Sequence, residues 1–261
     1  FRGIQREIIE SIGNGRDTLG LMPTGGGKSI TFQVPALSRD GICIVVTPLI
    51  ALMKDQVRNL RGRGIKAAAV YSGLSREEIL VTLENCIFGN YKFLYVSPER
   101  LASDIFLAKV RHMPVSFLTV DEAHCISQWG QDFRPVYLRI ADFVDSLPTR
   151  PVMGAFTATA TERVRQDIIR LLRLQNPETV TTGFDRPNLY FETRRALPSE
   201  KPRVLLELVL RERDNAGIIY CSTTRQVDET TRLLQSRGIR AAAYHAKLDA
   251  DTRRQNQDDF L

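Results

Sequence analysis

Short apolar runs alternate with amphipathic helical stretches along the whole chain, and this alternation restricts the folds that the chain can adopt. The runs are almost continuously apolar rather than alternating with polar residues, which is typical of strands buried on both faces of a parallel sheet. The predicted strands are residues 18–22, 42–47, 67–71, 93–97, 117–121, 152–156, 189–193, 217–221 and 241–245. The helices predicted between them include residues 52–61, 162–172 and 226–236. This pattern predicts an α/β fold built from βαβ units with parallel sheets.

One unit of this pattern occurs twice. Residues 63–70 read Arg-Gly-Ile-Lys-Ala-Ala-Ala-Val, and residues 237–244, which lie 174 positions later, read Arg-Gly-Ile-Arg-Ala-Ala-Ala-Tyr. In both copies a glycine stands at the end of a predicted helix, where glycine is favoured, and a predicted strand follows. The repeat favours two related domains in tandem over a chance likeness. We predict a first domain over residues 1–183 and the N-terminal part of a second, incomplete domain over residues 184–261, joined near proline-containing turns at 182–202.

The composition of the chain excludes several classes of protein. Hydrophobic residues make up 43% and charged residues 25%, as in globular proteins rather than disordered or fibrous ones. No segment approaches the roughly 18 uninterrupted apolar residues of a membrane span, so no membrane partner is expected. The four cysteines lie far apart and form no CxxC pair, so neither a zinc site nor a disulfide framework is predicted. We expect a reducing compartment, which means the cytoplasm and nucleoid of a bacterium or the nucleus of a eukaryote.

The basic residues of the chain are mostly arginine. The net charge is +6, and only seven of the 36 basic residues are lysine. Arginine binds phosphate groups bidentately, so this preference is compatible with a nucleic-acid partner. A genome rich in G and C produces the same preference through codon usage. The charge therefore permits nucleic-acid binding without demonstrating it.

A glycine-rich segment predicts a phosphate site. Residues 22–29 read Met-Pro-Thr-Gly-Gly-Gly-Lys-Ser and stand between a predicted strand and a predicted helix, which is the context that a P-loop requires. Backbone N–H groups of such a loop converge on phosphate oxygens at a helix N-terminus, which assigns nucleotide binding to Thr24, Gly25, Gly26 and Gly27. Lys28 would reach the β- and γ-phosphates, and the Ser29 hydroxyl would ligate Mg²⁺. Met22 stands where the strict pattern has glycine, and a flexible glycine-rich turn is the alternative interpretation.

Two adjacent carboxylates follow a predicted strand. The apolar residues 117–120 lead directly into Asp121 and Glu122, at the sheet edge where ligands of parallel α/β folds bind. Asp121 would hold Mg²⁺ through water, and Glu122 would orient and deprotonate the attacking water. An isolated Asp-Glu pair is usually a solvated strand end. Together with Lys28 and Ser29, the pair predicts a nucleoside triphosphatase.

These residues resemble those of a known family. Residues 22–29 and 121–124 are similar to superfamily 2 helicases, and residues 125–135 (Cys-Ile-Ser-Gln-Trp-Gly-Gln-Asp-Phe-Arg-Pro) resemble the aromatic-rich loop of RecQ-type DNA helicases. Further similar segments are residues 1–5, 47–49, 97–100, 156–161, 184–188 and 217–221. The resemblance implies two RecA-like domains that use ATP and Mg²⁺ to translocate 3′ to 5′ on single-stranded or partly duplex DNA, in repair and recombination.

The resemblance also assigns roles to individual residues. Adenine would be read by Arg2 and Gln5, and the backbone of single-stranded DNA would be bound by Thr47, Pro48, Ser97 and Arg100. The aromatic-rich loop would contact DNA and relay its presence to the ATP site through Gln128, Trp129, Phe133 and Arg134. Its polar neighbours indicate that Trp129, the only tryptophan, lies in an exposed loop rather than in the core. The family assigns coupling of the two domains to Thr157 and Thr159, beside Thr161 as the expected helix cap.

The chain departs from the family pattern at three places. Gln131 stands where the family usually has histidine, which would weaken the stimulation of hydrolysis by DNA. Lys247 stands where the second domain usually has glycine, and we expect a solvated side chain there. The sequence ends at Leu261, before the later motifs of the second domain and the arginine that reaches the γ-phosphate. We therefore expect residues 1–261 to bind Mg-ATP and DNA but to unwind DNA poorly.

Two alternatives to a DNA helicase stay open. An RNA helicase of the same superfamily is disfavoured by the aromatic-rich loop. A catalytically idle nucleic-acid-binding or strand-annealing module is favoured by Gln131 and the incomplete second domain, and disfavoured by Lys28, Ser29, Asp121 and Glu122.

Overall fold

The computed structural model describes residues 1, 3–23, 25–183 and 189–260. Contacts within the chain divide it into two compact units, Phe1–Asp185 and Arg186–Leu261. The predicted boundary between residues 183 and 184 adjoins a segment outside the described residues, so its position stays a prediction. Each unit is described here by itself.

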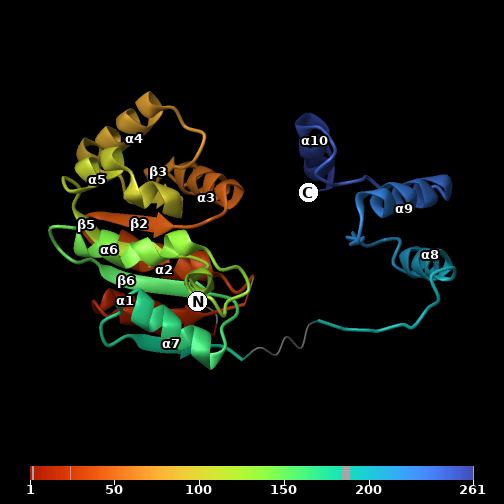
Figure 1. Ribbon diagram of the computed structural model, residues 1–261, viewed down its shortest axis with the longest axis horizontal. Coiled ribbons are helices and arrows are strands. Elements are labelled where there is room, and N and C mark those ends of the chain that lie inside the picture. Colours follow the sequence, from red (N-terminus) through yellow and green to blue (C-terminus); the bar gives the residue numbers. More distant parts are fainter. Residues whose placement is uncertain (2, 24, 184–188, 261) are drawn as a thin grey trace. The chain divides into compact units, whose positions relative to one another are not determined.

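The described part of the first unit contains a sheet of seven parallel strands in the order β3-β4-β2-β5-β6-β1-β7 (Figure 1). The strands are β1 (Thr18–Leu21), β2 (Ile42–Val46), β3 (Ala67–Val70), β4 (Phe93–Val96), β5 (Val115–Val120), β6 (Val152–Thr157) and β7 (Glu178–Thr181). The first six match the prediction from apolar runs. The sequence analysis missed β7, because only Val180 of its four residues is buried and its polar residues interrupt the apolar run.

Helices cover both faces of this sheet. They are α1 (Gln5–Gly13), α2 (Lys28–Leu37), α3 (Ile50–Gly62), α4 (Arg76–Phe88), α5 (Asp104–Val110), α6 (Ile140–Asp145) and α7 (Glu162–Leu171), with the 3₁₀ helices η1 (Pro98–Ala102), η2 (Ala123–Ile126) and η3 (Pro135–Arg139). The first three helices share one apolar cluster with one face of the sheet, and α4 to α7 share another cluster with the opposite face. In β2, for example, Ile44 belongs to one cluster and Val45 to the other. Burial on both faces explains why these strands are almost continuously apolar.

A buried carboxylate joins the N-terminal ends of three strands. Asp17, which is 3% exposed and precedes β1, accepts hydrogen bonds from the backbone N–H groups of Met153 in β6 (2.9 Å) and Gln175 before β7 (2.7 Å). The Arg150 guanidinium donates to the same carboxylate at 2.5 Å. These contacts fix the ends of β1, β6 and β7 opposite the edge where the glycine-rich segment lies.

The helix starts follow local sequence signals. Ser75 and Glu78 form a capping box at α4, in which the Ser75 N–H donates to the Glu78 carboxylate (2.7 Å) and the Glu78 N–H donates to Ser75 Oγ (3.2 Å). The Val164 N–H donates to Thr161 Oγ1 at 3.4 Å, so the predicted cap of α7 is confirmed. Both caps satisfy backbone donors that a helix leaves unpaired in its first turn.

The described part of the second unit contains the helices α8 (Lys201–Arg211), α9 (Thr224–Ser236) and α10 (Ala250–Phe260). The strands predicted at 189–193, 217–221 and 241–245 are wrong for this structure, because none of these residues is in a strand. A strand needs a hydrogen-bonded neighbour as well as an apolar composition. Here the apolar segments lie unpaired, and Tyr220 is 92% exposed.

The two copies of the sequence repeat end their helices in the same way. Gly64 and Gly238 adopt positive φ angles of 75° and 72°. The Ile65 N–H donates to Leu60 O at 3.0 Å, and the corresponding bond in the second copy, from Ile239 to Leu234, measures 3.1 Å. In the first copy the following residues form β3, whereas in the second they form no strand. The repeat therefore specifies the helix end but not the strand.

Candidate functional site

The glycine-rich segment connects β1 to α2 and takes a conformation that suits glycine. Gly25 and Gly27 have φ angles of 78° and 77°, in the left-handed region where glycine carries no steric cost. A Cβ atom on Gly27 would collide with the amide nitrogen of Gln5, and one on Gly26 would lie 2.9 Å from Pro23 O. The Gln5 side chain donates to Gly26 O at 3.0 Å, so α1 holds this segment in place.

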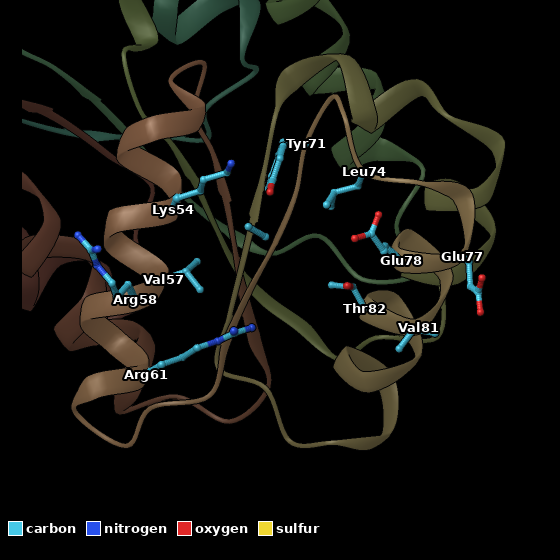
Figure 2. Close-up of a pocket in the computed structure, with 11 residues that line it drawn as sticks. Lys54, Val57, Arg58, Arg61, Tyr71, Leu74, Glu77, Glu78, Val81 and Thr82 are labelled. Carbon is cyan, nitrogen blue, oxygen red and sulfur yellow. The ribbon is translucent and has the colours of Figure 1, made fainter. Parts of the chain in front are cut away.

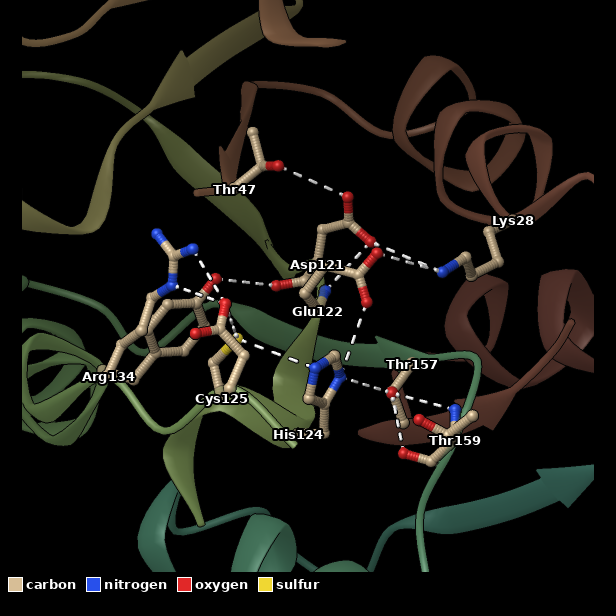
Figure 3. Close-up of polar contacts among 11 residues, drawn as sticks. Lys28, Thr47, Asp121, Glu122, His124, Cys125, Arg134, Thr157 and Thr159 are labelled. Carbon is tan, nitrogen blue, oxygen red and sulfur yellow. Dashed lines mark hydrogen bonds and ion pairs between the residues drawn. The ribbon is translucent and has the colours of Figure 1, made fainter. Parts of the chain in front are cut away.

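Lys28 is the first residue of α2, and its ammonium group faces two adjacent carboxylates (Figure 3). Its Nζ atom is 3.6 Å from Glu122 Oε1 and 4.0 Å from Asp121 Oδ1, and its side chain is 16% exposed. Asp121 and Glu122 follow β5, whereas Lys28 follows β1, and β6 separates these two strands in the sheet. The carboxyl edge of the parallel sheet therefore brings the three predicted catalytic residues together, as strand polarity requires.

Both carboxylate oxygens of Asp121 accept hydrogen bonds. Thr47 Oγ1 donates to Oδ2 at 3.3 Å, and the Glu122 N–H donates to Oδ1 at 3.0 Å. Burial raises the pKa of Asp121 above its usual value, the nearby Lys28 cation opposes this increase, and the Glu122 carboxylate adds to it. The Tyr137 hydroxyl donates to the carbonyl oxygen of Asp121 at 3.1 Å and thereby fixes the backbone at the end of β5.

Glu122 adopts a backbone conformation that is rare for residues other than glycine. Its φ angle is 48°, in the left-handed region, which commonly marks functional sites. The turn at Glu122 leads directly from β5 into η2 and directs its carboxylate toward both Lys28 and His124. The distance from Glu122 Oε2 to His124 Nδ1 is 3.4 Å.

His124 connects the end of β5 to the end of β6. Its Nδ1 atom lies 2.8 Å from Thr157 Oγ1, which in turn contacts the backbone oxygen (3.1 Å) and nitrogen (3.3 Å) of Thr159. A continuous polar path thus runs from the carboxylate of Glu122 to the two predicted coupling threonines (Figure 3). The sequence analysis assigned no role to His124, although its position two residues after Glu122 was a sufficient signal.

The two residues predicted to ligate a metal lie close to one cavity. Ser29 and Asp121 both line a small cavity of 20 Å³ between α2, α3 and the end of β2. A hydroxyl and a carboxylate are oxygen donors of the kind that Mg²⁺ prefers, with water and phosphate oxygens completing its coordination. The residues present therefore fit Mg²⁺. Among the described residues, no group of three or more His, Cys, Asp or Glu side chains forms a metal site.

The predicted aromatic-rich loop connects η2 to η3 and exposes its tryptophan. Trp129 is 60% exposed, so the prediction of an exposed loop is confirmed. Gln128 is also exposed, and Phe133 is half-buried. Arg134, which the sequence analysis predicted to contact DNA, forms an ion pair of 2.8 Å with Asp132 of the same loop.

Other predicted residues lie in different settings. Thr47 and Ser97, at the ends of β2 and β4, are buried, and Pro48 is half-buried. Arg100 donates to Tyr71 O at 3.2 Å. Their role in binding DNA stays a prediction. Two predicted nucleotide-binding residues, Arg2 and Thr24, and the similar segment 184–188 lie outside the described residues.

A larger cavity lies away from this site, between α3 and α4 beside the edge strand β3 (Figure 2). Its volume is 660 Å³, with basic side chains on the α3 wall and acidic ones on the α4 wall. The charged residues are Lys54, Arg58, Arg61, Glu77 and Glu78. None of the predicted site residues lines it.

Two general features of the chain complete the description. All four cysteines are free thiols, and burial raises the pKa of Cys43 and of Cys86 to about 12. Among the described residues, no helix combines the length and the apolar character that crossing a membrane requires.

Solved structures with a similar fold are helicases. The structure of the Mycobacterium smegmatis helicase Lhr bound to ssDNA and AMP-PNP matches 98% of this chain and 37% of that chain, with a TM-score of 0.69 and 20% identity. The Pyrococcus furiosus Hef helicase domain matches 91% of this chain and 53% of that chain, with a TM-score of 0.55 and 18% identity. At these identities the likeness concerns the fold alone, and it agrees with the predicted RecA-like α/β architecture.

Sequence comparison places the chain in a family. Residues 2–168 match the DEAD/DEAH box helicase family, and residues 200–261 match the helicase conserved C-terminal domain. The whole chain is 44% identical to the ATP-dependent DNA helicase RecQ of Bacillus subtilis and 42% identical to that of Haemophilus influenzae. It spans 44% and 42% of the length of these relatives. The chain therefore belongs to the DEAD/DEAH box helicase family, and its sequence is similar over its whole length to RecQ helicases.

Proposed function

We propose that this protein hydrolyses ATP with Mg²⁺ and uses the energy to move 3′ to 5′ along single-stranded DNA, as a RecQ-like helicase core. One observation carries the proposal: the Lys28 ammonium, at the N-terminus of α2, lies within 4.0 Å of both the Asp121 and the Glu122 carboxylates. Relatives with the printed name ATP-dependent DNA helicase cover this whole chain at above 40% identity and support the choice of nucleotide and nucleic acid.

The first step is binding of the triphosphate at the N-terminus of α2. Gly25, Gly26 and Gly27 leave the backbone there free of side chains, and the helix terminus favours negative charge. Lys28 then exchanges its carboxylate neighbours for the β- and γ-phosphate oxygens. Gln5 holds this loop through Gly26 O, and the family resemblance assigns its amide to reading the adenine edge.

Ser29 and Asp121 would hold Mg²⁺, which supplies positive charge to neutralise the phosphate oxygens when it is bound. Thr47 and the Glu122 N–H hold the Asp121 carboxylate in the orientation that this role needs. The Lys28 cation favours the ionised form of Asp121 against the effect of burial.

The Glu122 carboxylate is the general base. It accepts a proton from a water molecule whose oxygen forms a bond to the γ-phosphorus, while the bond from that phosphorus to the bridging oxygen of ADP breaks. His124 orients Glu122 by contacting Oε2, the carboxylate oxygen that Lys28 does not contact (Figure 3). Because His124 also contacts Thr157, a change at the coupling threonines reaches the general base through one side chain.

The DNA strand is bound through its phosphates and by stacking. The exposed Trp129 provides a ring face for a base, and such stacking is tolerant of sequence. Phosphate contacts release counterions, so we expect the affinity for DNA to fall steeply with salt. The chain's net charge of +6 favours this association.

The decisive experiment measures ATP hydrolysis with and without single-stranded DNA, in the wild type and in Lys28→Ala and Glu122→Gln variants. We expect DNA to stimulate the wild type, Lys28→Ala to lose ATP binding, and Glu122→Gln to bind ATP without hydrolysing it. Stimulation by single-stranded RNA but not by DNA would identify an RNA helicase instead. If DNA annealing or binding is the only activity and survives Lys28→Ala unchanged, the chain is a binding module and the proposal is wrong.

A further inference from the structure

The exposed loop that carries Trp129 is attached to one face of α7. Ser127 Oγ donates to Asp167 Oδ2 at 2.7 Å. The guanidinium carbon of Arg163 lies over the indole of Trp129, 3.5 Å from the ring centre. Arg163 and Asp167 are four residues apart, so their side chains lie on the same face of the helix. The loop therefore contacts α7 at two points. Asp167 binds the Ser127 hydroxyl, and Arg163 lies over the indole of Trp129.

The attachment through Ser127 also fixes the backbone of Trp129. The same Ser127 hydroxyl accepts a hydrogen bond from the Trp129 N–H at 3.1 Å. The next residue, Gly130, donates to Ser127 O at 2.9 Å, and a Cβ atom there would collide with His124 O. The backbone around Trp129 is thus held in a tight turn. The side-chain rotamer of Trp129 is the freedom that remains, and the contact with Arg163 restricts it.

The indole is covered on one face only. Arg163 lies over one face, yet Trp129 as a residue is 60% exposed, so we infer that the other face of the ring is open to a ligand. A free tryptophan side chain would lose rotamer freedom on stacking with a base, which weakens binding. A cation that already holds the ring in one orientation removes part of that loss.

We propose that Arg163 is a positioning residue that presents the open face of Trp129 for stacking with a base of single-stranded nucleic acid. This inference rests on the proposed function and adds a residue of α7 to it, outside the motifs that the sequence analysis identified. Arg163 is exposed, and its guanidinium also places a positive charge beside the stacked base, where it would attract the phosphate of that nucleotide.

The single tryptophan makes a direct test possible, because the intrinsic fluorescence of the protein above the tyrosine range comes from Trp129 alone. The variants are Arg163→Ala, Arg163→Lys, Trp129→Ala and the double variant. The matched control is Arg76→Ala, which removes one exposed arginine from the first turn of α4. The probe is a short labelled oligothymidylate, and the readouts are its dissociation constant and the anisotropy of Trp129 emission without DNA.

We expect Arg163→Ala to lower the anisotropy of Trp129 and to weaken oligothymidylate binding about two- to fivefold, the size of an exposed cation–π contact. Arg163→Lys should retain part of the anisotropy and part of the affinity. Arg76→Ala should leave the anisotropy unchanged. In the Trp129→Ala background, Arg163→Ala should weaken binding no more than Arg76→Ala does. The DNA concentration that half-maximally stimulates ATP hydrolysis should rise by the same factor, with the rate at saturating DNA unchanged.

Three results would overturn this inference while leaving ATP-driven movement on DNA intact. The first is unchanged anisotropy in Arg163→Ala, which means that the guanidinium does not hold the ring. The second is tighter binding in Arg163→Ala, which means that Arg163 competes with the base. The third is wild-type binding of oligothymidylate by Trp129→Ala, which excludes stacking on Trp129. If the wild type neither binds DNA nor is stimulated by it, the proposed function itself fails.

Discussion

The Nδ1 atom of His124 lies 2.8 Å from the hydroxyl of Thr157, although 33 residues separate the two in the chain. The same nitrogen is 3.4 Å from the Glu122 carboxylate. One imidazole thus joins the proposed general base to the end of β6, and β6 is the neighbour in the sheet of β5, the strand that precedes Glu122 and His124. Any displacement of Thr157 therefore changes the surroundings of Glu122.

This relationship predicts the effect of His124→Ala. His124→Ala removes the 3.4 Å contact with Glu122 and the hydrogen bond to Thr157. An ordinary hydrogen bond contributes about 0.5–1.5 kcal/mol, so the rate constant of ATP hydrolysis should fall roughly 2- to 10-fold. The affinity for ATP should change little, because His124 contacts neither Lys28 nor the glycine-rich segment. Steady-state kinetics with varied ATP checks this expectation. A rise in KM with an unchanged kcat would contradict it.

The buried carboxylate of Asp121 predicts a pH dependence of stability. Its pKa is raised above 3.8 in the folded protein, mainly by burial, so the folded state binds this proton more tightly than the unfolded state does. The stabilisation from this group is present below about pH 4 and is lost as the pH rises through the folded-state pKa. The asparagine in Asp121→Asn does not ionise, so the stability of this variant does not decrease over that pH range through this group. Its free energy of unfolding relative to wild type should therefore increase from about pH 4 to pH 7.

The measurement for Asp121 is urea unfolding of both proteins across that pH range. Ser29→Ala is the control, since it changes a neighbour in the same small cavity without removing a titrating group. A difference between Asp121→Asn and wild type that stays constant with pH would show that the proton affinity of Asp121 is the same in both states.

Gly25 and Gly27, the two glycines of the β1–α2 connection with positive φ angles, should respond differently to alanine. At Gly25 a Cβ atom would meet none of the described atoms within 4 Å, so Gly25→Ala carries only the conformational cost, about 1–2 kcal/mol. At Gly27 the Cβ atom would also collide with the Gln5 amide, so Gly27→Ala should be more destabilising. It should also weaken ATP binding more, because α1 and the loop must separate. Calorimetric titration with a non-hydrolysable ATP analogue and urea unfolding would measure both effects. Equal behaviour of the two variants would contradict the collision.

Asp17 predicts a stability effect without a direct effect on the phosphate site. Removing one partner of a buried ion pair costs about 3–5 kcal/mol, so Asp17→Ala should lower the free energy of unfolding by about that amount. The side chain also accepts two backbone hydrogen bonds, from Met153 and Gln175. Arg16→Ala is the matched control, because its ion pair with Glu178 is exposed and should contribute less than about 1 kcal/mol. Equal costs for the two variants would show that the Asp17 contacts are dispensable.

The phosphate site could be predicted from the sequence because strand polarity determines it. Lys28 follows β1 and Asp121 follows β5, and in a parallel sheet all carboxyl ends lie at one edge, so neither the strand order nor any side-chain contact had to be known. The run of glycines predicted a loop whose backbone approaches a phosphate closely, and in the structure Gly25 and Gly27 adopt the positive φ angles that suit glycine. These features depend on local sequence and on one rule of sheet geometry.

The features that the sequence did not reveal depend on contacts between distant residues. The role of Asp17 requires knowing that β6 and β7 flank β1, and the stacking of Arg163 on Trp129 requires the position of α7 against η2. The segments 67–70 and 241–244 are nearly identical, yet only the first forms a strand, because only it has β4 beside it. The apolar composition of a segment makes a strand possible, but the strand forms only where a neighbouring strand is available for hydrogen bonding.

The short connection from β1 to α2 has a consequence for how this chain can vary over evolution. Its two ends are fixed, by the hydrogen bond from the Met22 N–H to Thr157 O (3.0 Å) and by the bond from Gln5 to Gly26 O (3.0 Å). One inserted residue would have to be accommodated between these two fixed ends, and it would displace the backbone N–H groups that are proposed to bind the phosphates. Relatives should therefore tolerate some substitutions in this connection but no change in its length.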